Sequence, residues 1–209
     1  MKFKITLFFL IFIFLSLNTY AINNKYGLWS AIQFFGKFKN SPSYLYNLKL
    51  EARFKTTNHF YDEGFIRAAL GYALDDATTL FLGVDFFPAL GLSNRDHEEY
   101  RLWQQFKKNK AFEKFEFSSR TRIEQRKKSS NSQVAVRLRQ QFTLQKQQPL
   151  FKNFFPLLWD EVFINFNHVA WVNTHTINQN RLFLGFNTLY HSFTGQARIR
   201  VKMGQLNFK

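Results

Sequence analysis

The chain has 209 residues, of which 29 are Lys or Arg and 14 are Asp or Glu, so its formal net charge is +15. It has no cysteine, which excludes a disulfide framework, a thiolate metal site, a cysteine nucleophile and a lipid-modified cysteine. A mean hydropathy of −0.30 excludes a bundle of membrane-spanning helices. The length suits one domain or two small ones.

The N-terminus carries a targeting pattern. Two lysines precede an almost unbroken apolar run over residues 5–17, and small residues follow up to Ala21. This order predicts a secretory signal peptide over 1–21, cleaved after Ala21, and a single domain over 22–209. An uncleaved anchor is the alternative, but the run is shorter than the roughly 20 residues that a spanning helix needs. An exported chain without cysteine is typical of the bacterial envelope.

The remaining chain alternates between apolar and polar residues with a period of two. In segment 44–56 the even positions are apolar, as at Leu48 and Leu50. The odd positions include Lys49 and Glu51. Period two is typical of a β-strand that has one apolar face. Ten segments show this alternation: 26–38, 44–56, 65–74, 79–87, 98–107, 115–126, 134–145, 159–167, 180–190 and 197–204.

The length of these segments predicts a membrane barrel. Most are about 9–13 residues long, which suits tilted strands that cross a bilayer. Strands of soluble proteins are more often about 5–6 residues long. We therefore expect an all-β fold, an up-and-down antiparallel transmembrane β-barrel of about ten strands. Its termini would be periplasmic, and the longer connections 88–97 and 169–177 would share that side.

Alternation alone does not say which face is enclosed. A secreted soluble lipocalin-like binding protein, with its apolar face inside, would show the same pattern. Aromatic residues near strand ends favour the membrane arrangement, in which such rings form girdles at the interfaces. These residues are Tyr44, Tyr46, Tyr61, Phe86, Phe87, Tyr100, Trp159, Trp171, Tyr190 and Phe193. Mixed charges along one strand face also favour it, because they can pair across a narrow interior.

Several motifs resemble a known family. The C-terminal residues 204–209, with Phe208 near the end, look like the signal read by the barrel-assembly machinery of outer membranes. Further motifs are Trp29-Ser30, Glu99 to Trp103, Arg120 to Arg126, Trp159 to Glu161 and Asn180 to Gly185. Together they resemble an uncharacterised Gram-negative family, domain of unknown function 2490, whose members are predicted outer-membrane barrels. The resemblance implies location and architecture, and it brings no catalytic residues.

The polar strand faces carry more bases than acids, so an enclosed polar face would be positively charged. We expect a lumen charge network of Glu99, Arg101, Arg120, Arg122, Glu124, Arg137, Arg139, Glu161, Arg181, Arg198 and Arg200. Barrels of about eight strands are filled by their own side chains. We therefore expect a structural barrel, or one that contacts lipopolysaccharide, outer-membrane lipid or a small anionic ligand. A small anion-selective channel or transporter is the alternative.

No catalytic, cofactor or metal site is predicted. Outer-membrane lipid hydrolases resemble barrels with a His–x–Ser pair on one strand face. Here His191 and Ser192 are adjacent, so they would point to opposite faces. The acidic pair Asp75-Asp76 is better explained by turn chemistry than by calcium binding. Nucleic acid is not an expected partner, because the bases are spread along the chain rather than clustered.

Overall fold

The structure is a computed structural model that describes residues 27–55, 63–89, 97–172, 175–188 and 205–208. Its elements are β1 (Gly27–Phe38), β2 (Ser41–Lys55), β3 (Glu63–Ala73), β4 (Thr78–Phe87), β5 (Glu99–Ala111), β6 (Phe115–Lys128), β7 (Val134–Lys146), β8 (Phe154–Asn165), β9 (Ile177–Thr188) and β10 (Gln205–Phe208). The expected signal peptide over 1–21 and the expected strand over 197–204 lie outside these residues. No helix in the described ranges is long and apolar enough to cross a membrane.

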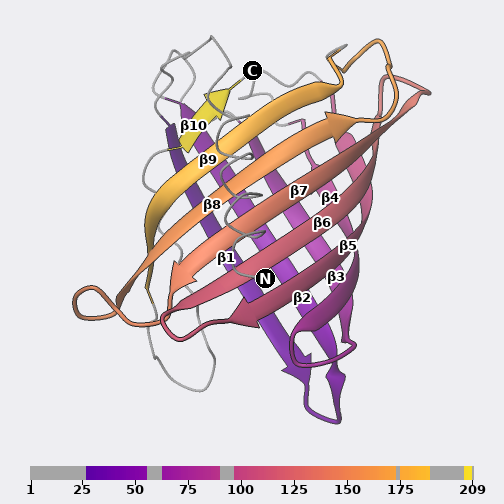
Figure 1. Cartoon of the computed structure of the whole chain (residues 1–209). Helices are drawn as coiled ribbons and strands as arrows, with labels where there is room; N and C mark the ends of the chain where they lie inside the picture. Colours follow the sequence, from indigo (N-terminus) through magenta and orange to yellow (C-terminus); the bar gives the residue numbers. More distant parts are fainter. Residues whose placement is uncertain (1–26, 56–62, 90–96, 173–174, 189–204, 209) are drawn as a thin grey trace.

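The strands form one antiparallel sheet in which each strand pairs with its neighbour in the chain, from β1 to β10. Figure 1 shows the sheet curling, so that its tilted strands wrap round a common interior. Within the described part of the chain, no ladder joins β1 to β10. The expected all-β, up-and-down antiparallel order is therefore confirmed as a curled sheet.

The expected strand segments that fall on described residues are confirmed, with differences at their ends. The largest difference is β8, which begins at Phe154 rather than at residue 159. Pro156 made a strand there unexpected, because proline cannot donate a ladder hydrogen bond. The strand nevertheless continues through it, and Pro156 pairs with Phe186 of β9. One missing donor does not end a strand whose other residues keep their partners.

Alternate residues of each strand face opposite sides of the curled sheet. In β4, Leu82 and Val84 are 56% and 52% exposed on the outer face. Phe81, which precedes Leu82, and Asp85, which follows Val84, are 7% and 2% exposed on the enclosed face. The exposed apolar side chains of β1–β5 include Ile32, Phe34, Leu48, Leu50, Ile66, Leu70, Leu80, Leu82, Val84 and Leu102. The apolar face of the strands is therefore the outer one, and the charged face is enclosed.

Glycines let large aromatic rings lie flat on the enclosed face. Gly83 pairs with Trp103 across β4 and β5, and Gly71 pairs with Phe81 across β3 and β4. A Cβ atom at Gly83 would lie 2.2 Å from Cζ2 of the Trp103 ring. Only glycine leaves room for this approach, so the two residues act as a pair that holds the sheet curvature.

The two ends of the sheet differ. One end, which we call the turn end, carries the connections 39–40, 74–77, 112–114 and 147–153. At one of these turns the backbone N–H of Ala77 donates to Asp75 over 2.7 Å, which holds the pKa of that carboxyl below its usual value. The opposite end, which we call the terminal end, carries the start of β1, the end of β10 and the connections 88–98, 129–133 and 166–176. The two long connections expected on the side of the termini, 88–97 and 169–177, therefore do lie at the end where β1 begins and β10 ends.

Candidate functional site

The enclosed face of the sheet, which we call the lumen, holds a network of ion pairs centred on Glu124. Its carboxylate is fully buried. It accepts hydrogen bonds from Nη2 of Arg137 at 2.5 Å and from Nη1 of Arg139 at 2.7 Å. Nη1 of Arg122 lies 3.7 Å away. Three arginines from two strands thus compensate one carboxylate, as burial of a charge requires.

Glu161 is the second centre of the network. Its Oε1 accepts from Nη2 of Arg120 at 2.5 Å and from Nε of Arg139 at 2.9 Å. Arg139 therefore links Glu161 to Glu124 and joins β6, β7 and β8 on the lumen side. Such shared pairs fix the position of each guanidinium group.

Glu99 holds two further arginines at the terminal end. It is the first residue of β5 and is buried. Nε of Arg101 donates to it over 2.6 Å, and Nε of Arg126 donates over the same distance. The guanidinium of Arg101 lies 3.7 Å from the ring centre of Phe87, a cation–π contact that covers its other face.

Asp85 is bound by a different set of donors on β3–β5. Arg67 donates to both of its oxygens, at 2.7 and 2.6 Å. The indole N–H of Trp103 donates to the same carboxylate over 2.8 Å. The guanidinium of Arg122 lies 3.9 Å from the centre of the Trp103 ring. This cluster thus connects the ion pairs of β3 and β4 with those of β6.

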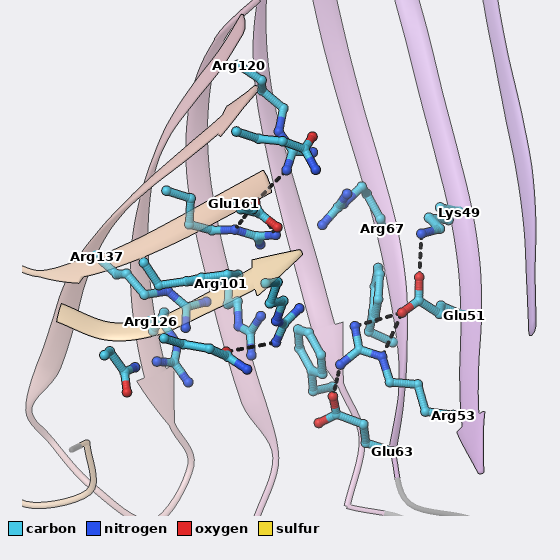
Figure 2. A pocket seen from close by; sticks show the side chains of 18 of the residues that line it. Lys49, Glu51, Arg53, Glu63, Arg67, Arg101, Arg120, Arg126, Arg137 and Glu161 are labelled. Atoms are coloured by element: carbon cyan, nitrogen blue, oxygen red, sulfur yellow. Dashed lines mark hydrogen bonds and ion pairs between the residues drawn. The ribbon is translucent and has the colours of Figure 1, made fainter. Parts of the chain in front are cut away.

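The wall formed by β2 and β3 carries a smaller group of charges. Glu51 pairs with Lys49 and with Arg53 on its own strand. Arg53 also pairs with Glu63, the first residue of β3. Figure 2 shows these residues facing Arg120, Arg137 and Glu161 across the lumen.

The structure places most of the expected network together. Arg120, Arg122, Glu124, Arg137, Arg139 and Glu161 are joined by the contacts above, and Glu99 and Arg101 form a second group with Arg126. Arg181 faces the same space, donates to Gln179 over 3.0 Å and lies 4.6 Å from the Phe163 ring centre. Arg198 and Arg200 lie outside the described residues. Arg53, Arg67, Asp85 and Arg126 share strand parity with the expected residues and were predicted on the same polar face, but not as members of the network.

Sequence reasoning also missed the aromatic residues of the lumen. Phe87 and Trp159 were expected in an outer girdle, and this was wrong because their parity is that of Asp85 and Glu161. Trp171 lies over the terminal end, within 5.2 Å of Arg126. Tyr44, Phe86 and Tyr100 do lie on the outer face, whereas Tyr61, Tyr190 and Phe193 lie outside the described residues. Counting alternate positions along each strand from its charged residues would have separated the aromatic residues that face the lumen from those on the outer face.

A cavity of about 370 Å³ lies among these side chains. Its lining includes the bases Lys49, Arg53, Arg67, Arg101, Arg120, Arg126, Arg137, Arg139 and Arg181, and the acids Glu51, Glu63 and Glu161. Their direct ion-pair partners add Asp85, Glu99 and Glu124, and Glu124 in turn pairs with Arg122. Ten bases then stand against six acids, so the bases outnumber the acids by four within this set. The cavity is therefore a positively charged space.

The lumen differs between its two ends. Glu63, Glu99 and Arg126 lie close to the terminal end of their strands. Towards the turn end, two buried apolar clusters occupy the enclosed face. One consists of Leu45, Ala69, Phe81 and Trp103, and the other of Leu157, Trp159 and Phe183. The charged cavity is thus bounded by apolar side chains on the turn side.

The outer face carries one polar stripe, on the wall opposite the apolar strands β1–β4. Thr121 donates to Gln140 over 2.6 Å, and Gln140 donates to Ser119 over 3.0 Å. Asp160, on the neighbouring strand β8, has one carboxylate oxygen without a hydrogen-bond partner among the described residues. A carboxylate oxygen without a partner is unusual in a folded protein, even beside the neutral polar side chains of this stripe.

Fold and site together define a curled antiparallel β-sheet with an apolar exterior and an arginine-rich interior. The chain belongs to the family described as protein of unknown function (DUF2490), whose model matches residues 26–206. It is also similar to an uncharacterized protein of Methylorubrum extorquens, with 30% identity over 128 residues, 59% of this chain and 55% of that protein. The chain thus spans about half the length of that curated relative. No solved structure matches it.

Proposed function

We propose that this protein is an outer-membrane β-barrel whose lumen is largely filled by arginine-rich ion pairs. In this role it would be a structural barrel, or one that contacts lipopolysaccharide or a small anionic ligand. The observation that carries the proposal is the inverted distribution of side chains. Leu70 is 63% exposed on the outer face, whereas Glu124 and Trp103 are fully enclosed. Lipid is the solvent that makes such an exterior stable.

The same distribution argues against the soluble lipocalin-like alternative. A lipocalin-like protein would need its apolar strand faces inside and its charges in water. Here the exposed apolar side chains of the adjacent strands β1–β5 share one face, whereas soluble monomers rarely expose large contiguous apolar patches. A signal peptide over residues 1–21 and export across the inner membrane fit this location.

Cell fractionation tests the location directly. We expect the processed protein in the outer-membrane fraction, and we expect its unheated form to migrate differently from the boiled form on a denaturing gel. This heat-modifiable migration reports a barrel that resists detergent. Recovery of the mature protein as a free species in periplasmic extract would contradict the proposal.

A small anion-selective channel is the second candidate, because the lumen carries excess positive charge. The apolar clusters around Phe81 and Phe183 oppose it, since they occupy the enclosed face on the turn side. Planar-bilayer recordings of the refolded protein separate the two candidates. We expect no stable conductance steps, whereas stable anion-selective steps would favour the channel.

A further inference from the structure

The charged cavity is the feature of this protein that points furthest beyond a structural barrel. Its bases and their partners leave an excess of positive charge in an enclosed space, as counted above. A purely structural network has no need of such an excess, because like charges in a low-dielectric interior repel one another. An anionic group inside the cavity would remove that repulsion.

Two hydrogen-bond donors on the cavity wall strengthen this argument. Nε of Arg120 and the indole Nε1 of Trp171 are buried, and neither has an acceptor among the described residues. Both residues line the cavity. A third such donor, Nη1 of Arg122, lies 3.7 Å from Glu124. Buried donors without acceptors are costly, so they indicate a missing acceptor group.

The identity of the bases narrows the class of ligand. Every arginine among the described residues faces the lumen, and Lys49 is the one lysine that lines the cavity. Guanidinium groups suit the planar, two-point recognition of phosphate and carboxylate. Several are held in place by ring contacts, such as Arg139 over Phe163 at 4.7 Å. The site is therefore organised before any ligand arrives.

The size and position of the cavity limit the size of the ligand and the route by which it enters. A volume of about 370 Å³ lies at the lower end of the range for small-molecule pockets. Its lining reaches Arg53, Glu63 and Asn178 at the terminal end of their strands. Trp159, which stacks on Phe183 of the apolar cluster, limits it on the turn side. A ligand would therefore enter and leave by the terminal end.

We propose that this cavity binds a small phosphorylated molecule, whose oxyanion accepts from Nε of Arg120 and offsets the excess charge. The inference deepens the proposed function and rests on it for the ligand-contacting role. With the termini in the periplasm, as expected from the sequence, the ligand would be a soluble periplasmic solute. The site would hold the molecule without passing it through the barrel.

Isothermal titration of the refolded full-length chain with inorganic pyrophosphate tests the inference. We expect saturable binding of one pyrophosphate per chain, weakening as salt is added, and no binding of the polycation spermidine. In Arg120→Gln we expect about tenfold weaker binding, equivalent to about 1.4 kcal/mol, because a charge-assisted hydrogen bond is lost. Glu161 keeps Arg139 in that variant, so the network should survive.

A control variant keeps the result interpretable. Lys152→Gln removes one exposed positive charge from the connection at the turn end, and we expect no change. Absence of saturable binding to the wild-type chain, or equal weakening in Lys152→Gln, would overturn the inference. Outer-membrane location is measured separately by fractionation, so failure here would leave that proposal standing.

Discussion

Glu124 is the residue on which most of the lumen charge converges. It contacts Arg137, Arg139 and Arg122, and its side chain is excluded from solvent. We expect Glu124→Gln to lower the free energy of unfolding by about 3–5 kcal/mol, because three arginines lose their shared counter-charge. Urea unfolding in lipid vesicles, followed by tryptophan fluorescence, measures the change.

The matched control is Glu113→Gln in the exposed turn between β5 and β6. It removes the same charge from a solvated position, so we expect a change of less than about 0.5 kcal/mol. A loss in Glu124→Gln no larger than in this control would show that the lumen pairs contribute little to stability.

At the scale of single elements, the contact between Gly83 and Trp103 holds β4 close to β5. We expect Gly83→Ala to destabilise the fold by about 1–3 kcal/mol, because the new methyl group must displace the indole ring. Displacement would also stretch the hydrogen bond from Trp103 to Asp85. Ala68→Val, on the outer face of β3, adds volume without this clash, and an equal loss there would contradict the explanation.

In the outer polar stripe we predict a substitution that stabilises the fold. Asp160 faces outward from β8, and one of its oxygens has no partner among the described residues. We expect Asp160→Leu to raise the free energy of unfolding in lipid vesicles by about 1 kcal/mol, because a polar group leaves an apolar surface. Leu158→Asp, at the next outward position, should lower it. Destabilisation by Asp160→Leu would indicate that the stripe contacts something other than lipid.

Strands could be predicted from the sequence because alternation with a period of two is a local property of the chain. The alternation within a segment such as 44–56 predicts both that the segment is a strand and which of its side chains share a face. Pairing between strands is not local. Arg120 and Glu161, for example, are hydrogen-bonded although they are 41 residues apart in the sequence. The sequence therefore predicted the membership of most of the charged face but not its partners. It also did not predict that Trp159 and Phe87 would lie among those charges.

At the scale of the whole molecule, the open question is which end of the sheet faces the periplasm. The connections 88–98 and 166–176 lie at the end where β1 begins and β10 ends, whereas the periplasmic turns of outer-membrane barrels are usually short. Because the chain lacks cysteine, single cysteines can report the orientation. We expect Glu113→Cys, at the turn end, to react with a membrane-impermeant maleimide on intact cells. Ser130→Cys, at the terminal end, should react only after permeabilisation, and the reverse pattern would show that the termini are exposed on the cell surface.

The proposed outer-membrane location requires that lipid covers the outer face of the curled sheet. Single nitroxide labels at positions 79–86 of β4, apart from Gly83, in protein reconstituted into vesicles, test this most directly. We predict that labels replacing Leu80, Leu82 and Val84 collide readily with oxygen, which is concentrated in bilayers, and poorly with a water-soluble nickel chelate. Labels replacing Phe81 and Asp85 should be sheltered from both, and Gly83 is left unlabelled because a side chain there would displace Trp103. Ready collision of the even-numbered labels with the nickel chelate would place that face in water and contradict the account.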